Sequence, residues 1–182
     1  MEREGMRLPS REEIAQALEL RHTKAVQEKL REARVAVCGL GGLGSNIAVA
    51  LARCGVGSLH LLDFDRVELT NLNRQQYFAC QLGMPKTEAL KEVLLAIHPY
   101  LNIRTDQVRL TEENAVRLLE EDLYICEAFD VPEAKAMLTN CVLERFPEKY
   151  LVGASGMAGY GDSNRIRTRR ILPRYYLCGD GV

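Results

Sequence analysis

Three glycines near the start of the chain have the spacing of a nucleotide-binding loop. Gly39, Gly41 and Gly44 lie between a short apolar run, predicted to be a buried strand, and a predicted helix. Glycines in this setting make a tight turn and let the backbone approach phosphate oxygens, and the start of the helix favours negative charge. Asp63 follows at the end of the second predicted strand, where a carboxylate meets ribose hydroxyls. The pattern predicts nucleotide binding without choosing between NAD and ATP, and a structural glycine turn is the alternative.

A group of polar residues after the second predicted strand favours a triphosphate ligand. Its members are Asp65, Asn71, Asn73, Arg74, Gln75 and Gln76. Ligands of doubly wound sheets bind at this carboxyl edge of the strands. A hydride-transferring dehydrogenase has no need for so many polar groups there, whereas an enzyme that handles a triphosphate does. Arg74 offers a planar fork of donors for phosphate oxygens.

Two later charged residues fit the same sheet edge. Lys86 begins the next predicted helix, where the helix dipole disfavours a cation, so a nearby anion would explain its position. Asp130 ends the fourth predicted strand, where a carboxylate can hold a hydrated Mg²⁺. Each residue taken singly also fits an ordinary solvent-exposed side chain. Their common place at strand ends predicts a site.

The elements that position these residues alternate between strand and helix. Strands are predicted at 34–39, 58–65, 102–108, 122–129 and 149–156, and helices at 11–31, 39–55, 87–98, 111–121 and 132–145. A capping box formed by Ser10 and Glu13 marks the start of the first helix. This order predicts an α/β fold with a doubly wound, mostly parallel, Rossmann-like sheet. The irregular stretch 65–86 is long for a connection, and such loops are usually functional.

The length and composition indicate one globular domain. The chain has 182 residues, of which 47% are hydrophobic and 27% charged. We expect an N-terminal helix at 10–31, a core at 33–156 and a β-rich tail at 157–182. Because the chain ends in a predicted turn at Gly181–Val182, we expect that further sequence follows or that this is a short member of its class.

The tail carries a row of arginines. Arg165, Arg167 and Arg169 are predicted to share one face of a strand, because side chains alternate across a strand. One interpretation is an edge strand that its charges guard against pairing with other strands. The other is a contact surface for an anionic tail or partner.

The composition argues against several other classes of protein. The formal net charge is -1, which points neither to nucleic acid nor to an anionic membrane. No apolar run is long enough to span a membrane, and the polar N-terminus lacks a signal-peptide core, so we expect a cytoplasmic protein. The six cysteines lack paired spacing, so no zinc is expected. We expect buried thiols except at Cys178, which looks exposed.

Two motifs resemble the bacterial ThiF and MoeB adenylyltransferases of the ubiquitin-activating-enzyme-like superfamily. The family pattern GxGGxGS corresponds to Gly39–Ser45, and the highly specific pattern DxDxVxxxNLNRQ corresponds to Asp63–Gln75. The family lysine and the later aspartate correspond to Lys86 and Asp130. The resemblance covers roughly residues 30–155 and is greatest to a ThiF subgroup of thiamine biosynthesis without zinc cysteines.

The resemblance implies an ATP-dependent adenylyltransferase that uses Mg²⁺. Such an enzyme activates the C-terminal glycine of a ubiquitin-like sulfur carrier, ThiS-like and ending in Gly-Gly, as an acyl-adenylate and releases pyrophosphate. It also implies a homodimer. The alternatives are a MoaD-like carrier, a tRNA or small-molecule carboxylate, a non-catalytic nucleotide-binding scaffold, or an NAD-dependent oxidoreductase.

The resemblance also assigns roles to residues. Nucleotide binding is expected at Gly39, Gly41, Gly42, Gly44, Asp63, Asp65, Asn71, Asn73, Arg74, Gln75 and Lys86. Within that set, Asp63 would meet the ribose, and the backbone of Gly41 and Gly42 would approach the phosphates. Catalytic roles are expected for Arg74, Lys86 and Asp130, with Asp130 holding Mg²⁺. Less defined candidates are Arg11 or Arg21 acting across a dimer, and Cys178 as a reactive thiol.

Overall fold

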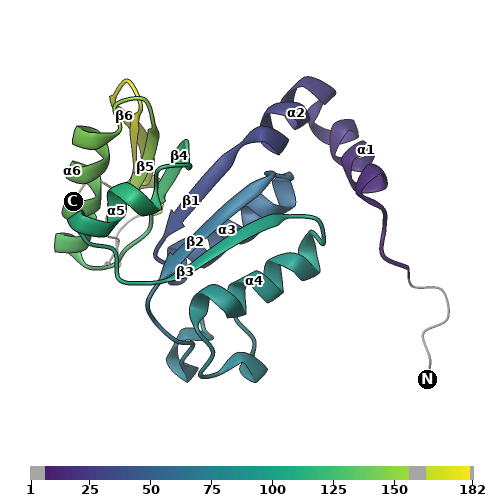
Figure 1. The fold of residues 1–182 in the computed structure, drawn as a ribbon, viewed down its shortest axis with the longest axis horizontal. Coiled ribbons are helices and arrows are strands. Elements are labelled where there is room, and N and C mark those ends of the chain that lie inside the picture. The colour runs from purple at the N-terminus through teal and green to yellow at the C-terminus, as the bar shows by residue number, and fades with distance from the viewer. Residues whose placement is uncertain (1–6, 156–162, 181–182) are drawn as a thin grey trace.

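A mostly parallel sheet forms the centre of the molecule (Figure 1). The structure is a computed structural model that describes residues 7–155 and 163–180. The strands of these residues are β1 Arg34–Cys38, β2 Ser58–Asp63, β3 Asn102–Gln107, β4 Tyr124–Glu127, β5 Tyr150–Ala154, β6 Arg167–Leu172 and β7 Tyr175–Gly179. Their order is β3-β2-β1-β4-β5-β7-β6, and only β6 runs antiparallel to its neighbour. The predicted doubly wound α/β fold is confirmed.

Helices cover both faces of the sheet. They are α1 Arg11–His22, α2 Lys24–Glu32, α3 Gly42–Cys54, α4 Lys86–Ile97, α5 Glu112–Leu118 and α6 Pro132–Arg145. Successive residues of a strand point to opposite faces. On β1, Val37 therefore packs in the core beneath α3 and α4, whereas Ala36 packs in the core beneath α5 and α6. Among the helices of the described residues, none is long and apolar enough to cross a membrane.

The predicted N-terminal helix is wrong in one respect, because it is broken at Thr23. The capping box of Ser10 and Glu13 is present and begins α1. Thr23 has φ of 85°, which ends α1 and turns the chain into α2. The turn lets α2 pack on the body of the protein, where the buried Gln27 donates a hydrogen bond to the carbonyl of Gly55 at 3.2 Å. The polar helix α1 buries no residue, so it has no packing that would continue one straight helix.

The tail differs from its prediction at one arginine. Arg167 and Arg169 lie on β6, but Arg165 lies in the short 3-10 turn before the strand. β6 is the outermost strand of the sheet, as the interpretation of a charged edge expects. Residues 157–162 of the expected tail and the expected turn at Gly181–Val182 lie outside the described residues.

The expectation for the cysteines is also partly wrong. Cys54 and Cys80 are exposed, whereas Cys178 on β7 is half-buried. Cys54 is the last residue of α3, and Cys80 lies in a 3-10 turn of the long loop. Apolar neighbours in the sequence therefore do not bring either thiol into the core. Cys178 is thus not the most accessible thiol. Burial raises the pKa of the Cys38 thiol, which stays protonated in the core.

A buried histidine on β2 links strands through two carboxylates. His60 is 2% exposed, and its Nδ1 lies 2.7 Å from Oδ2 of Asp122, which precedes β4 by two residues. Its Nε2 lies 2.8 Å from Oδ2 of Asp106 on β3. The Asp122 side chain is buried as well, and His60 is the hydrogen-bond partner of its carboxyl group.

We expect His60→Leu to destabilise the fold by about 3 kcal/mol, because it leaves the buried Asp122 carboxylate unpaired. The double variant His60→Leu/Asp122→Leu should recover part of that loss, since it removes both polar partners. Urea denaturation followed by circular dichroism measures both. A single variant as stable as the parent would contradict this account.

Candidate functional site

The glycines of the loop differ in how much space surrounds them. Gly39 has φ of 90°, and a Cβ there would lie 2.9 Å from the carbonyl oxygen of Ala128. A Cβ on Gly44 would lie 1.8 Å from the carbonyl oxygen of Gly39. By contrast, the nearest atom to a Cβ on Gly41 would be Nε2 of Gln75 at 3.9 Å. Gly39 and Gly44 therefore shape the turn, while Gly41 leaves the backbone at the start of α3 accessible.

The carboxylate of Asp63 holds this loop in place. Its Oδ2 accepts a hydrogen bond from the backbone N–H of Leu40 at 2.6 Å, and its Oδ1 accepts one from Asp65 N–H at 2.8 Å. Asp63 is buried at the end of β2, beside β1. Sequence reasoning did not predict this loop-holding contact. Each oxygen retains a second lone pair, so the ribose role of Asp63 stays a prediction.

Lys86 is a buried cation whose anion comes from the chain itself. It is 6% exposed, and its Nζ lies 2.9 Å from Oδ2 of Asp65. The Lys86 backbone N–H also donates to the Asp65 carbonyl at 2.9 Å. The Asp65 side chain is half-exposed, so the pair opens to solvent on the carboxylate side. The anion that the sequence required at this helix start is therefore Asp65 in this structure.

The first turn of α3 is tied to the loop that carries the polar motif. Ser45 Oγ donates to the carbonyl of Gly41 at 2.7 Å and accepts the N–H of Gln76. Asn46 Nδ2 donates to the carbonyls of Gly42 at 2.6 Å and Arg74 at 3.1 Å. Gln76 Nε2 completes the link by donating to Asn46 Oδ1. Sequence reasoning assigned no role to Asn46, although its place one helical turn after Gly42 was a usable signal.

Tyr77 anchors the end of the same loop. Its hydroxyl donates to the carbonyl of Leu40 at 2.7 Å. Burial, together with the negative charges of Asp63 and Asp65, raises the pKa of the Tyr77 hydroxyl well above its ordinary value. The hydroxyl therefore stays protonated as a donor. Tyr77 lies next to the recognised motif but was also not predicted.

Among the motif residues, Arg74 lies next to Gly42 at the start of α3. Its aliphatic part would lie 3.3 Å from a Cβ on Gly42. Its Nη1 donates to Oδ1 of Asn73 at 3.0 Å and to the carbonyl of Thr70. Asn71 Oδ1 instead accepts from the N–H of Glu68, which closes the turn before the motif. Asn73 and Asn71 thus have local partners, while the exposed guanidinium lies beside the start of α3.

The amide oxygen of Gln75 is a buried hydrogen-bond acceptor that lacks a donor among the described residues. The residue is 7% exposed, and its Oε1 finds no hydrogen-bond partner among the described residues. Leaving a buried acceptor unpaired costs about 1–3 kcal/mol. The amide lies next to Gly41. The unpaired oxygen thus belongs to a side chain that borders the accessible backbone at the start of α3.

Asp130 lies at the same edge of the sheet, on the loop after β4. That loop is held by Glu127, which accepts from the N–H of Phe129 at 2.8 Å and from Nζ of Lys135 at 3.0 Å. Phe129 and the neighbouring Ala128 close against Gly39, so the loop borders the glycine turn. The described residues contain no group of three or more His, Cys, Asp or Glu side chains able to hold a metal ion. A magnesium ion held by Asp130 would therefore take further ligands from the bound phosphates.

The remaining candidates lie away from this edge within one chain. The guanidinium of Arg11 lies 5.4 Å from the ring centroid of Tyr100, just before the start of β3 and thus at the opposite edge of the sheet. Arg21 is exposed on the same helix, α1. Cys178 lies on β7, three strands from β1, or about 14 Å across the sheet. A role of Arg11 or Arg21 at the site would need a second copy of the chain.

The fold and this edge place the chain in the doubly wound class of α/β proteins, whose ligands bind at the carboxyl ends of the strands. The ThiF family matches residues 14–173, and the chain belongs to that family. A molybdopterin-synthase adenylyltransferase from Haemophilus influenzae is 36% identical over 136 residues, which cover 69% of this chain and 56% of that protein. The adenylyltransferase and sulfurtransferase UBA4 from Candida glabrata is 33% identical over 150 residues, covering 82% of this chain but 34% of that protein. The chain thus spans only part of each relative.

Solved structures share the fold of this chain. The tRNA N6-threonylcarbamoyladenosine dehydratase TcdA of E. coli, in complex with ATP, superposes with a TM-score of 0.85 at 22% identity, covering 97% of this chain and 85% of that one. The same protein in complex with AMP gives 0.80 at 26% identity, covering 90% and 68%. These likenesses confirm the fold over nearly the whole chain.

We expect the glycines of the loop to respond differently to substitution. Gly44→Ala should destabilise the protein by more than about 3 kcal/mol, because its Cβ would meet backbone that cannot move aside. Gly41→Ala should cost only about 1 kcal/mol, the effect of alanine at a helix N-cap. Thermal unfolding of the two variants side by side tests this, and equal losses would show that the loop packs differently.

Proposed function

We propose that the chain binds MgATP at the carboxyl edge of β1 and β2 and adenylates a carboxylate. The observation that carries the proposal is the accessible backbone at the start of α3, flanked by the Arg74 side chain and by Gln75, whose amide oxygen is unpaired. A helix N-terminus with nearby positive charge suits phosphate. The names of the relatives support ATP rather than NAD, because they are adenylyltransferases and the TcdA structures contain ATP and AMP.

The chemical problem in adenylation is charge. An anionic carboxylate attacks the α-phosphate of ATP, the acyl-adenylate forms and pyrophosphate leaves. Donors and cations that face the developing negative charge lower the barrier most. In the proposal, Arg74 and the N–H groups at Gly41 and Gly42 bind phosphate oxygens. Lys86 supplies a second cation, for which the phosphates compete with the half-exposed Asp65.

The amide of Gln75 has a defined orientation in this proposal. Phosphate oxygens only accept hydrogen bonds, so the amide nitrogen would face them. The unpaired oxygen would then accept from a ribose hydroxyl or a water molecule. Asp63 holds the loop and keeps free lone pairs for the ribose. Asp130 is the residue that would hold Mg²⁺, which when bound neutralises charge on the phosphates.

We propose that the acceptor is the C-terminal glycine of a ubiquitin-like sulfur carrier, with a ThiS-like carrier of thiamine biosynthesis as the first candidate and a MoaD-like one as the next. The name of the H. influenzae relative supports a protein as the acceptor, because it names molybdopterin synthase as what that enzyme adenylates. A carboxylate on tRNA is the second candidate function. The observation in its favour is that the TcdA structure at 26% identity aligns with 90% of the chain. A homodimer is part of the proposal, since only a second copy can bring Arg11 or Arg21 to the site.

ATP–pyrophosphate exchange tests the function directly. We expect exchange that requires both Mg²⁺ and an acceptor, measured in parallel with ThiS-like and MoaD-like carriers ending in Gly-Gly and with tRNA. Exchange with one acceptor alone names the substrate class. ATP binding without exchange for any of them would contradict adenylation and favour a nucleotide-binding scaffold.

We expect Arg74→Ala and Lys86→Ala each to lower the exchange rate about a hundred- to thousandfold, because each removes a cation from the phosphates. Arg53→Ala, which removes an exposed arginine at the far end of α3, is the matched control and should keep full activity. Circular dichroism should show an unchanged fold for all three. Exchange retained in Arg74→Ala or Lys86→Ala would refute that residue's role.

A further inference from the structure

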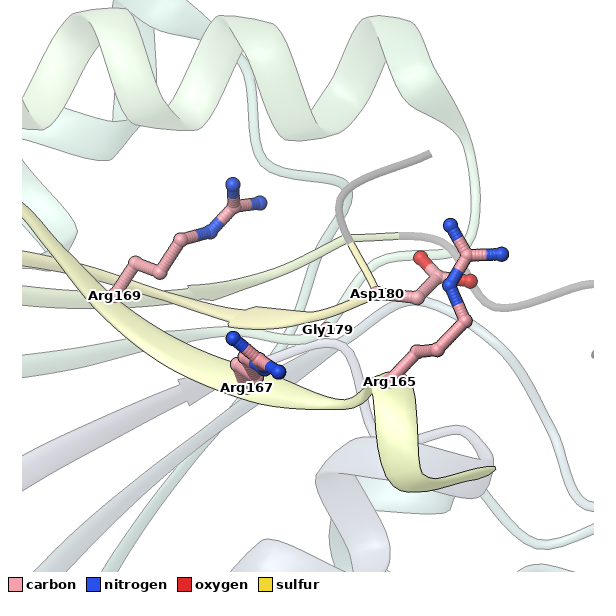
Figure 2. Close-up of a pocket in the computed structure, with 5 residues that line it drawn as sticks. All are labelled: Arg165, Arg167, Arg169, Gly179 and Asp180. Atoms are coloured by element: carbon pink, nitrogen blue, oxygen red, sulfur yellow. The ribbon is translucent and has the colours of Figure 1, made fainter. Parts of the chain in front are cut away.

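A second feature of the sheet lies at its outer edge, away from the proposed nucleotide site. Arg165, Arg167 and Arg169, with Gly179 and Asp180, line a cavity of about 280 Å³ (Figure 2). We propose that this edge binds an extended acidic segment of a partner protein, which adds to β6 as a further strand. We call residues 165–170, the chain that would meet this segment, the arginine edge.

Three of the four arginines in the arginine edge have no polar partner in the described part of the chain. Within residues 7–155 and 163–180, the guanidinium groups of Arg165, Arg167 and Arg169 make no hydrogen bond or ion pair. Two neighbouring arginines differ. Arg170 donates twice to the carbonyl of Pro173, and Arg174 donates to the carbonyl of Pro147. The free guanidinium groups are therefore those that face the cavity.

The spacing of these charges matches a peptide strand. Alternate residues of a strand lie about 6.6–6.8 Å apart on one face. A peptide strand beside β6 repeats this spacing, so two acidic side chains two residues apart would lie opposite Arg167 and Arg169. Opposite charges across neighbouring strands stabilise their pairing. Asp180 accepts a hydrogen bond from Ser155 and lies beside Arg165 in Figure 2, so its carboxylate directs acidic side chains to the Arg167 and Arg169 end.

The backbone of β6 supplies the other part of the site. Among residues 7–155 and 163–180, β6 pairs only with β7, so within this part of the chain its outer N–H and C=O groups are open to another strand. Charge that merely guards an edge does not require exposed aliphatic groups, yet Ile166 is 46% exposed, Ile171 47% and Leu172 48%. The register shifts between Arg170 and Leu172, which ends the regular edge there.

These properties favour a peptide over a nucleic acid. The open backbone offers ladder hydrogen bonds, which only another peptide backbone completes. β6 carries no aromatic side chain on which a base could stack. An acidic, extended protein segment satisfies both the charge and the backbone, whereas a polynucleotide would satisfy the charge alone.

Fluorescence anisotropy tests the proposal with the full chain and a labelled peptide that alternates Glu and Val. We expect saturable binding that Arg167→Glu/Arg169→Glu weakens at least about tenfold, since like charges then face each other. The control Arg31→Glu/Arg53→Glu makes the same charge change at exposed arginines of α2 and α3 and should leave the affinity unchanged. Arg167→Gln/Arg169→Gln, which only removes the charges, should weaken binding to a lesser extent.

A second pair of ligands separates strand addition from simple charge attraction. The same peptide with alternate backbone amides N-methylated keeps its charge but loses ladder hydrogen bonds, and it should bind at least about tenfold more weakly. Equal binding of the methylated peptide, equal loss in the control variant, or tighter binding of oligouridylate would each overturn the proposal, as would absence of peptide binding. The assay needs neither ATP nor a carrier, so its result is independent of the adenylation proposal.

Discussion

The site depends first on one buried carboxylate. Asp63 accepts hydrogen bonds from the N–H groups of Leu40 and Asp65, so a single side chain joins the glycine loop after β1 to the polar loop after β2. Hydrogen bonds to a charged group are stronger than those between neutral groups. The geometry of the start of α3 and of the Asp65–Lys86 pair follows from this junction.

Around this junction, side chains of α3 and of the loop after β2 hold this loop in a defined arrangement. Asn46 donates to the backbone carbonyls of Gly42 and Arg74 and accepts from Gln76, and Tyr77 closes the loop on Leu40. Beside these contacts, the amide oxygen of Gln75 is one of three buried side-chain polar atoms that lack a hydrogen-bond partner among the described residues, together with Thr87 Oγ1 and His98 Nδ1. Such exceptions in a protein call for a ligand, a water molecule or a functional reason.

The carboxyl edge of the sheet has two chemically different ends. The glycine loop and Lys86 gather at β1 and β2, while the arginine edge begins on β6, four strands from β1, or about 19 Å across the sheet. β7 runs parallel to β5 and so ends at the same edge, and Arg167 pairs with Gly179 at the end of β7. Both ends therefore face the same side of the molecule, one suited to a nucleotide and the other to an acidic chain.

The sequence by itself determined the alternation of strands and helices, the glycine turn and the motif after β2, because these are local patterns set by residue type and spacing. The order of the strands in the sheet was not predicted from the sequence, and the tertiary structure supplies it. Only the tertiary structure decided that Asp63 holds the loop, that Lys86 pairs with Asp65, and that the first helix breaks at Thr23. Each of these depends on contacts between residues far apart in the chain or on the packing available to a helix face. Local spacing carries no record of such contacts.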